Sequence, residues 1–164
     1  MEALFSLLEA LQNAELPTAL RLSTLTYPLV NAAHIIGLAL LFGSIFALDL
    51  RLLGFWPSIP VEPLSRILLP VAIGGLIMAL LTGALLFSVH AVKYAGMGIF
   101  QVKLLLVLAA ITNVLLLHRT VAWKSATAPE TIGNPALRVK IAALFSILLW
   151  VSAIICGRMI AYYA

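Results

Sequence analysis

His34 is the residue whose position most strongly indicates chemistry. It lies in a run of 27 residues without formal charge, from Leu22 to Leu48, and a helix needs roughly 20 such residues to cross a bilayer. An ionisable side chain at that depth is costly, so it usually faces the interior of a bundle or a bound group. At helical spacing, His34 shares its face with three other polar side chains, Tyr27, Asn31 and Ser44. This face is predicted to be the inside of the protein.

Lys103 is the second ionisable residue expected below the membrane surface. Only fifteen residues without formal charge separate it from Arg119, which is too few to cross a bilayer, so the span must take in Lys103 as well. A lysine near a helix end can also snorkel outward to the headgroups, and that alternative stays open. His90, Lys93 and Arg158 are expected at the same end of the bundle, where they would surround the buried imidazole and amine with further basic groups.

This set of side chains suits a b-type haem. His34 would be the axial ligand through its neutral imidazole, with Lys103 or His90 near the opposite face of the ring and the cations Lys93 or Arg158 paired with the propionates. The other imidazole nitrogen would need an acceptor, which a carbonyl one turn away or Asn31 could supply. A histidine in a membrane helix can equally serve as an interhelical hydrogen-bond partner, and spacing alone leaves that alternative open.

Two other functions compete with haem binding. A copper-resistance or copper-transport protein would use soft ligands, and Met97, Met159 and His90 could gather at one surface. A cofactor-free accessory subunit would instead pack against a larger membrane complex. Hydrolytic chemistry is disfavoured because no nucleophile–base pair or carboxylate pair stands out. The predicted spans contain no acidic residue, which argues against a proton-coupled transporter.

The composition is that of a polytopic membrane protein. The chain has 164 residues, of which 63% are hydrophobic and 10% charged, and its mean hydropathy is +1.15, far from the soluble globular range. One transmembrane domain covering residues 1–164 is expected. The net charge of +4 comes from Lys and Arg scattered at helix ends, which is typical of topology signals and not of nucleic-acid binding.

The elements that position His34 and Lys103 are predicted to form an all-α, antiparallel four-helix bundle. The spans are expected at about residues 25–48, 67–89, 99–118 and 139–159, and Asp49 is taken to close the first of them. A short amphipathic helix at about residues 2–14, ended by Pro17, would lie in the membrane interface. The connector from Gly54 to Pro63 is expected to be extended, and Pro70 would fall in the first turn of the second span.

Small residues and basic residues give two further expectations. The glycines Gly37, Gly43, Gly74 and Gly75 and, nearer the end of the second span, the small residues Thr82 and Gly83 allow close packing of helices within the bundle. Those of the second span would equally serve contacts in a homo-oligomer. Six Lys and Arg residues lie on the side of the first and third connectors and four on the other side. This bias predicts that both termini lie outside the cell membrane.

Several motifs resemble those of an uncharacterised family of small bacterial four-span membrane proteins. The main one is Tyr27-Pro28-x5-His34-x2-Gly37-Leu-Ala-Leu-Leu-x-Gly43-x5-Asp49-Leu-Arg51-Leu-Leu-Gly54. Others are Thr82-Gly83, Lys93-Tyr94-Ala95, Phe100-x2-Lys103 and Cys156-Gly157-Arg158. The resemblance covers nearly the whole chain and implies a bacterial inner membrane protein; the bias of basic residues would then place both termini in the periplasm.

More distantly, the chain is similar to the superfamily that contains the copper-resistance D membrane proteins and the haem-containing membrane protoporphyrinogen oxidase. In the oxidase, a first-span histidine is implicated in haem binding and a third-span lysine is functionally important, which match His34 and Lys103. The intervening motifs differ, so the substrate is not carried over. The resemblance favours a b-type haem protein that transfers electrons or acts as an oxidoreductase on a membrane-soluble partner such as a quinone.

Overall fold

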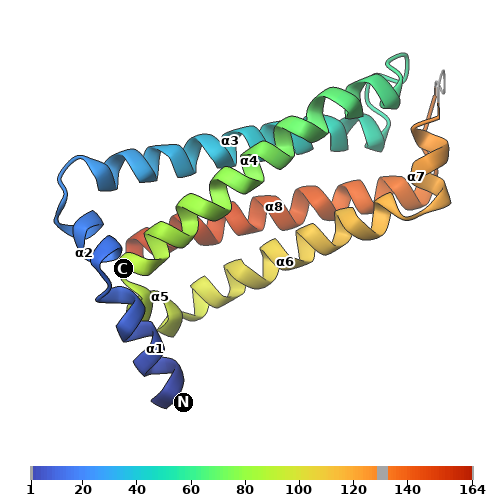
Figure 1. Cartoon of the computed structure of the whole chain (residues 1–164). Helices are drawn as coiled ribbons and strands as arrows, with labels where there is room; N and C mark the ends of the chain where they lie inside the picture. Colours follow the sequence, from blue (N-terminus) through green and yellow to red (C-terminus); the bar gives the residue numbers. More distant parts are fainter. Residues whose placement is uncertain (1, 129–132, 164) are drawn as a thin grey trace.

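The computed structural model describes residues 2–128 and 133–163, and within them every regular element is a helix. Figure 1 shows four long helices running side by side, with the short helices gathered at the two ends. The all-α four-helix bundle predicted from the sequence is therefore confirmed. In chain order the helices are α1 (Glu2–Gln12), α2 (Glu15–Leu22), α3 (Thr26–Leu53), α4 (Val61–Val89), α5 (Ala91–Gly96), α6 (Gly98–His118), α7 (Val121–Ala126) and α8 (Leu137–Tyr163).

The long helices α3, α4, α6 and α8 have the length and composition of membrane spans. They contain 28, 29, 21 and 27 residues, and at 1.5 Å per residue they are between about 32 and 44 Å long, enough for a hydrocarbon core of about 30 Å. Large apolar side chains face outward from them: Ile35, Leu81 and Leu105 are 58%, 65% and 66% exposed. Such a surface is stable in lipid and not in water, so the chain is a multi-pass membrane protein surrounded by a bilayer.

The closest helix contact joins α3 and α4 through two glycines. A Cβ atom on Gly75 would lie 2.6 Å from the backbone nitrogen of Leu41 and 2.7 Å from the carbonyl oxygen of Gly37. Only glycine permits such an approach, and this is how small residues stabilise helix pairs in membranes. Gly43 and Gly74, by contrast, have open space beside them, so two of these four glycines pack helices within the bundle.

The two helix pairs α3–α4 and α6–α8 are joined mainly by packing of α3 on α8. Among the described residues, α4 and α6 have no extended contact with each other. They approach at the end of the bundle that carries α5 and diverge toward the end that carries α7 (Figure 1). One flank of the bundle is therefore less tightly closed than the others.

The predicted helix ends differ from the observed ones where charge and proline were taken as breaks. Helix α3 continues past Asp49 to Leu53, and Gly54, with a φ of +111°, ends it in the left-handed conformation. Helix α4 begins at Val61, so the prediction that Pro70 lies in the first turn is wrong, and Pro70 is inside the helix. Its side chain is exposed on the outer surface, and neighbouring groups make proline tolerable in membrane helices.

Arg51 explains why α3 does not end at its charged residues. Its side chain is only 1% exposed and donates hydrogen bonds to three carbonyl oxygens: from Nε to Ile59 at 2.5 Å, and from Nη2 to Pro57 at 3.3 Å and Gly133 at 3.0 Å. Two of these belong to the α3–α4 connector and the third to the chain just before α8. Arg51 thus holds two connectors together.

The N-terminal segment contains two helices where one was predicted. Helix α1 ends at Gln12, and Pro17 lies in the first turn of α2, where a missing N–H costs little. Helix α1 packs on α5 and α2 on α4, and both lie across the end of the bundle near the N-terminus of α3 (Figure 1).

Candidate functional site

The neighbouring helix α4 holds His34 and defines the tautomer of its neutral imidazole. Its Nδ1 lies 3.1 Å from Oγ1 of Thr82, and that hydroxyl donates its own proton to the carbonyl of Met78 at 2.6 Å. The Thr82 oxygen therefore accepts a hydrogen bond from His34, so Nδ1 carries the proton and Nε2 carries the lone pair. The partner of Nδ1 is Thr82, not the predicted Asn31, whose side chain is exposed.

Gly83 provides the space that the imidazole occupies. A Cβ atom at this position would lie 3.0 Å from Cε1 of His34, closer than ordinary van der Waals contact. Thr82 and Gly83 are adjacent in α4, so one turn of helix supplies both the hydrogen bond and the room for the ring.

Lys103 reaches the same region from α6. Its side chain is half-buried and lies along Gly157 of α8, where a Cβ atom would be 3.5 Å from both Cε and Nζ. All four spanning helices thus contribute to one basic cluster, which we call the His34 cluster and define as His34, Thr82, Gly83, Lys103 and Gly157.

The remaining predicted residues lie at the same end of the bundle but outside this cluster. His90 follows α4 and meets Tyr94 edge to face at a centroid distance of 6.1 Å. Lys93 is exposed on α5, and the exposed guanidinium of Arg158 lies 5.2 Å from the ring centre of Tyr162.

Tyr27, which the helical spacing placed on the same face as His34, contacts the short helix α5. It is half-buried near the start of α3 and hydrogen-bonds with Tyr94 of α5. Burial first, and then this contact with Tyr27, raise the pKa of Tyr94 above its ordinary value. Tyr27 therefore links α3 to the short helix α5.

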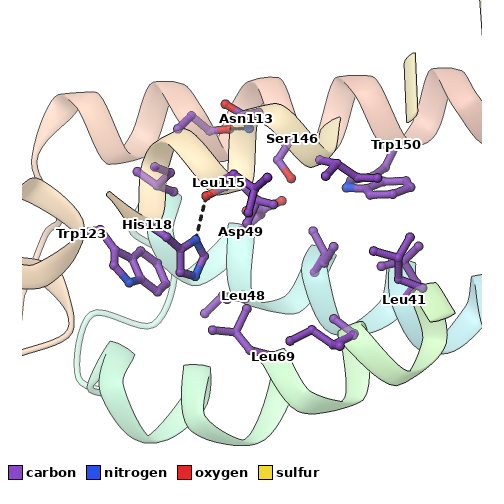
Figure 2. A pocket seen from close by; sticks show the side chains of 18 residues that line it. Leu41, Leu48, Asp49, Leu69, Asn113, Leu115, His118, Trp123, Ser146 and Trp150 are labelled. Carbon is purple, nitrogen blue, oxygen red and sulfur yellow. Dashed lines mark hydrogen bonds between the residues drawn. The ribbon is translucent and has the colours of Figure 1, made fainter. Parts of the chain in front are cut away.

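A second polar region, at the opposite end of the bundle, was missed in the sequence. It is a partly open cavity of about 360 Å³ bounded by α3, α4, α6, α7 and α8, shown in Figure 2. Most of its lining is apolar, and its polar side chains are Asp49, Asn113, His118 and Ser146. We call this region the Asp49 cavity.

Asp49 is the most unusual residue of that cavity. It is 5% exposed, accepts a hydrogen bond from the Ser146 hydroxyl, and has no hydrogen-bond partner for Oδ2 among the described residues. None of the described residues that line the cavity is a Lys or an Arg. A buried carboxylate with neither a countercharge nor full hydrogen bonding is costly, so the prediction that the spans contain no acidic residue is corrected here.

His118 and Asn113 face the cavity from α6. Nδ1 of His118 lies 2.8 Å from the carbonyl oxygen of Val114, which fixes the proton on Nδ1 and leaves Nε2 as an acceptor. Its ring lies against Trp123 at a centroid distance of 4.2 Å. Asn113 donates to the carbonyl of Ala142 at 2.9 Å and so joins α6 to α8.

One signal in the sequence could have revealed Asp49 as an intramembrane residue. Glycine is the preferred residue just after a helix, and Gly54 is the first glycine after Asp49. Taking the end of the span from this glycine instead of from the first charge would have placed Asp49 inside the helix.

The spans and their packing define a multi-pass helical membrane protein. No family model, no curated protein and no solved structure matches this chain. The resemblances given above therefore stay predictions. Among the described residues, no three His, Cys, Asp or Glu side chains gather as a metal-binding group, and the copper alternative likewise stays a prediction.

Proposed function

We propose that this chain is a bacterial inner membrane protein that binds a b-type haem through Nε2 of His34 and takes part in electron transfer. The observation that carries the proposal is the hydrogen bond from His34 to Thr82, whose own proton is committed to Met78. It prepares a neutral imidazole with a free lone pair, which is the form that ligates iron.

The surroundings of His34 define what haem binding would require. Gly83 and Gly157 leave the space that the imidazole and the Lys103 side chain themselves occupy, so a flat prosthetic group beside His34 would require the helices to move apart there. A bound haem would supply a one-electron iron couple. The ammonium of Lys103 would disfavour the oxidised, more positive iron, because like charges repel in a medium of low dielectric constant, and would therefore raise the reduction potential.

The exposed cations at the same end have a role in this proposal. Lys93 and Arg158 would pair with the haem propionates as charge-assisted hydrogen-bond donors, and the redox partner would be a quinone or another membrane-soluble molecule. The termini would lie in the periplasm.

An absorption spectrum tests the proposal. The detergent-purified protein, from cells supplied with a haem precursor, is expected to show a Soret band and sharp bands after reduction with dithionite. His34→Ala should be colourless, whereas His118→Gln, at the opposite end of the bundle, should keep the spectrum. Full Soret absorbance in folded His34→Ala, or a colourless folded wild-type protein, would refute the role of His34.

A further inference from the structure

The Asp49 cavity has the properties of a binding site that opens toward lipid. Its apolar walls come from all the spanning helices, and α4 contributes Leu69, Ala72, Ile73 and Leu76. The opposite wall is α6, which diverges from α4 toward this end of the molecule (Figure 1). A molecule dissolved in the bilayer could therefore reach the cavity between α4 and α6.

The polar groups of the cavity define the head of such a molecule. Among the residues that the structure describes, Oδ2 of Asp49 has no hydrogen-bond partner, and Nε2 of His118 is an acceptor because Nδ1 holds the ring proton. The part of the chain that the structure describes therefore offers two acceptors here. Figure 2 shows both side chains on the walls of one cavity. A head with several N–H donors and a positive charge fits them best.

Charge and aromatic rings favour a cation over a neutral or anionic head. The lining holds a carboxylate but no Lys or Arg, so a positive head would supply the missing countercharge, and an anion would be repelled. Trp123 and Trp150 also line the cavity, and indole faces attract cations. A phospholipid headgroup fits less well, because its phosphate would find no cation in this lining.

We propose that the Asp49 cavity binds a lipophilic amine, that is, a protonated amino group on an apolar body without phosphate. The ammonium donates hydrogen bonds to Asp49 and His118, and the body lies along the aliphatic wall of α4. This site is independent of haem at His34, because the two residues are about 22 Å apart along α3 at 1.5 Å per residue.

The test compares three probes that differ only in the head. A twelve-carbon amine, alcohol and carboxylic acid, each brominated at the far end, are titrated into the protein in phosphatidylcholine nanodiscs, and quenching of tryptophan fluorescence is measured. A Trp56→Phe background removes the tryptophan of the exposed α3–α4 connector, so the signal comes from Trp123 and Trp150. Partition into protein-free nanodiscs is subtracted.

The amine is expected to quench at about tenfold lower concentration than the alcohol, as a charge-assisted hydrogen bond predicts, and the acid should be weakest. Asp49→Asn should abolish the advantage of the amine and leave the alcohol unchanged. Glu62→Gln, which removes a carboxylate that is paired with Arg66 outside the cavity, should keep it.

Equal quenching by amine and alcohol in the unmutated cavity would overturn the proposal without any need for the variant to fold. An amine advantage that persists in folded Asp49→Asn would also overturn it. Phosphatidylethanolamine nanodiscs give the last arm: if that lipid displaces the amine probe at its bilayer concentration, the occupant is a lipid headgroup and the assignment to a free amine is wrong.

Discussion

The His34 cluster and the Asp49 cavity lie in opposite halves of the same bundle and are built in opposite ways. Around His34 the helices close on one another, and small residues on α4 and α8 leave space only for the side chains present. Around Asp49 the helices α4 and α6 diverge and large side chains line an open volume. The first region holds two basic groups and the second a carboxylate.

This difference shows how one simple fold can prepare two kinds of binding. Close packing fixes the direction of a side chain, as Thr82 does for the imidazole of His34, and suits a ligand that requires one coordinating atom. A flank that is not tightly closed and contains a buried charge determines the charge of the ligand's polar head, and it places few restrictions on the shape of the apolar part. The two regions should therefore respond separately to substitution, unless the contact between them is broken.

Breaking that contact should have the largest effect. Gly75→Leu would place side-chain atoms where a Cβ alone lies 2.6 Å from the backbone of Leu41, so α3 and α4 would have to separate and both regions would be lost. We expect a destabilisation of about 3 kcal/mol or more, seen as aggregation in size-exclusion chromatography and a lowered thermal midpoint. The matched control is Gly74→Leu, since Gly74 has open space beside it. Equal behaviour of the two variants would contradict the glycine contact.

A substitution at Gly83 should separate the two regions. Gly83→Ala would put a methyl group 3.0 Å from Cε1 of His34, so the imidazole must move and its hydrogen bond to Thr82 must weaken. We expect haem occupancy to fall by about tenfold, the size of effect typical of a group that orients a metal ligand, with quenching by the amine probe unchanged. The Soret absorbance per protein measures the first effect.

Gly43→Ala is the control for that experiment, because a Cβ at Gly43 meets nothing within 4 Å. Loss of amine binding in Gly83→Ala would show that the two regions are not independent.

The smallest expected effect concerns pH at the end of the bundle that carries the His34 cluster. Because the pKa of Tyr94 is raised in the folded protein, its phenol binds its proton more tightly there than in the unfolded chain. The corresponding stabilisation is fully present below about pH 10, the ordinary value for tyrosine, and is lost as pH rises through the folded pKa.

A phenolate absorbance titration should therefore show one tyrosine that ionises late. Tyr94→Phe should remove this late transition, whereas Tyr163→Phe, at an exposed site near the C-terminus, should leave it. A titration of Tyr94→Phe that still contains the late component would assign it to another residue.

The fold could be predicted because apolar runs long enough to span a bilayer leave few alternatives to a helical bundle. The helix ends could not be predicted, because a charged residue or a proline was expected to mark the water-exposed end of a span. Arg51 is instead surrounded by carbonyls of the next connector and of the chain just before α8, and the buried Asp49 accepts a hydrogen bond from Ser146 of α8. Such contacts join residues far apart in the sequence, and local patterns do not contain them.

Part of the His34 cluster was accessible from the sequence. The depths of His34 and Lys103 follow from the lengths of the uncharged runs, and the structure places both side chains beside glycines of neighbouring helices at the same end of the bundle. The hydrogen-bond partner of the imidazole could not be predicted from the sequence, because it depends on how α4 is rotated about its axis. Gly75, Ala79, Thr82 and Gly83 recur at helical spacing and all face α3; the small residues of this span were predicted to pack helices, but which face of α4 meets His34 was not.

The side chain of Arg51 has a mechanical consequence. One guanidinium joins the end of α3, the connector that leads into α4 and the backbone just before α8, so three of the four spans are fastened at a single point. Helix α6 is not bound by this guanidinium and is joined to the rest of the bundle mainly by its packing on α8. At this end of the molecule α6 is the span that Arg51 does not fasten, and the Asp49 cavity lies against it.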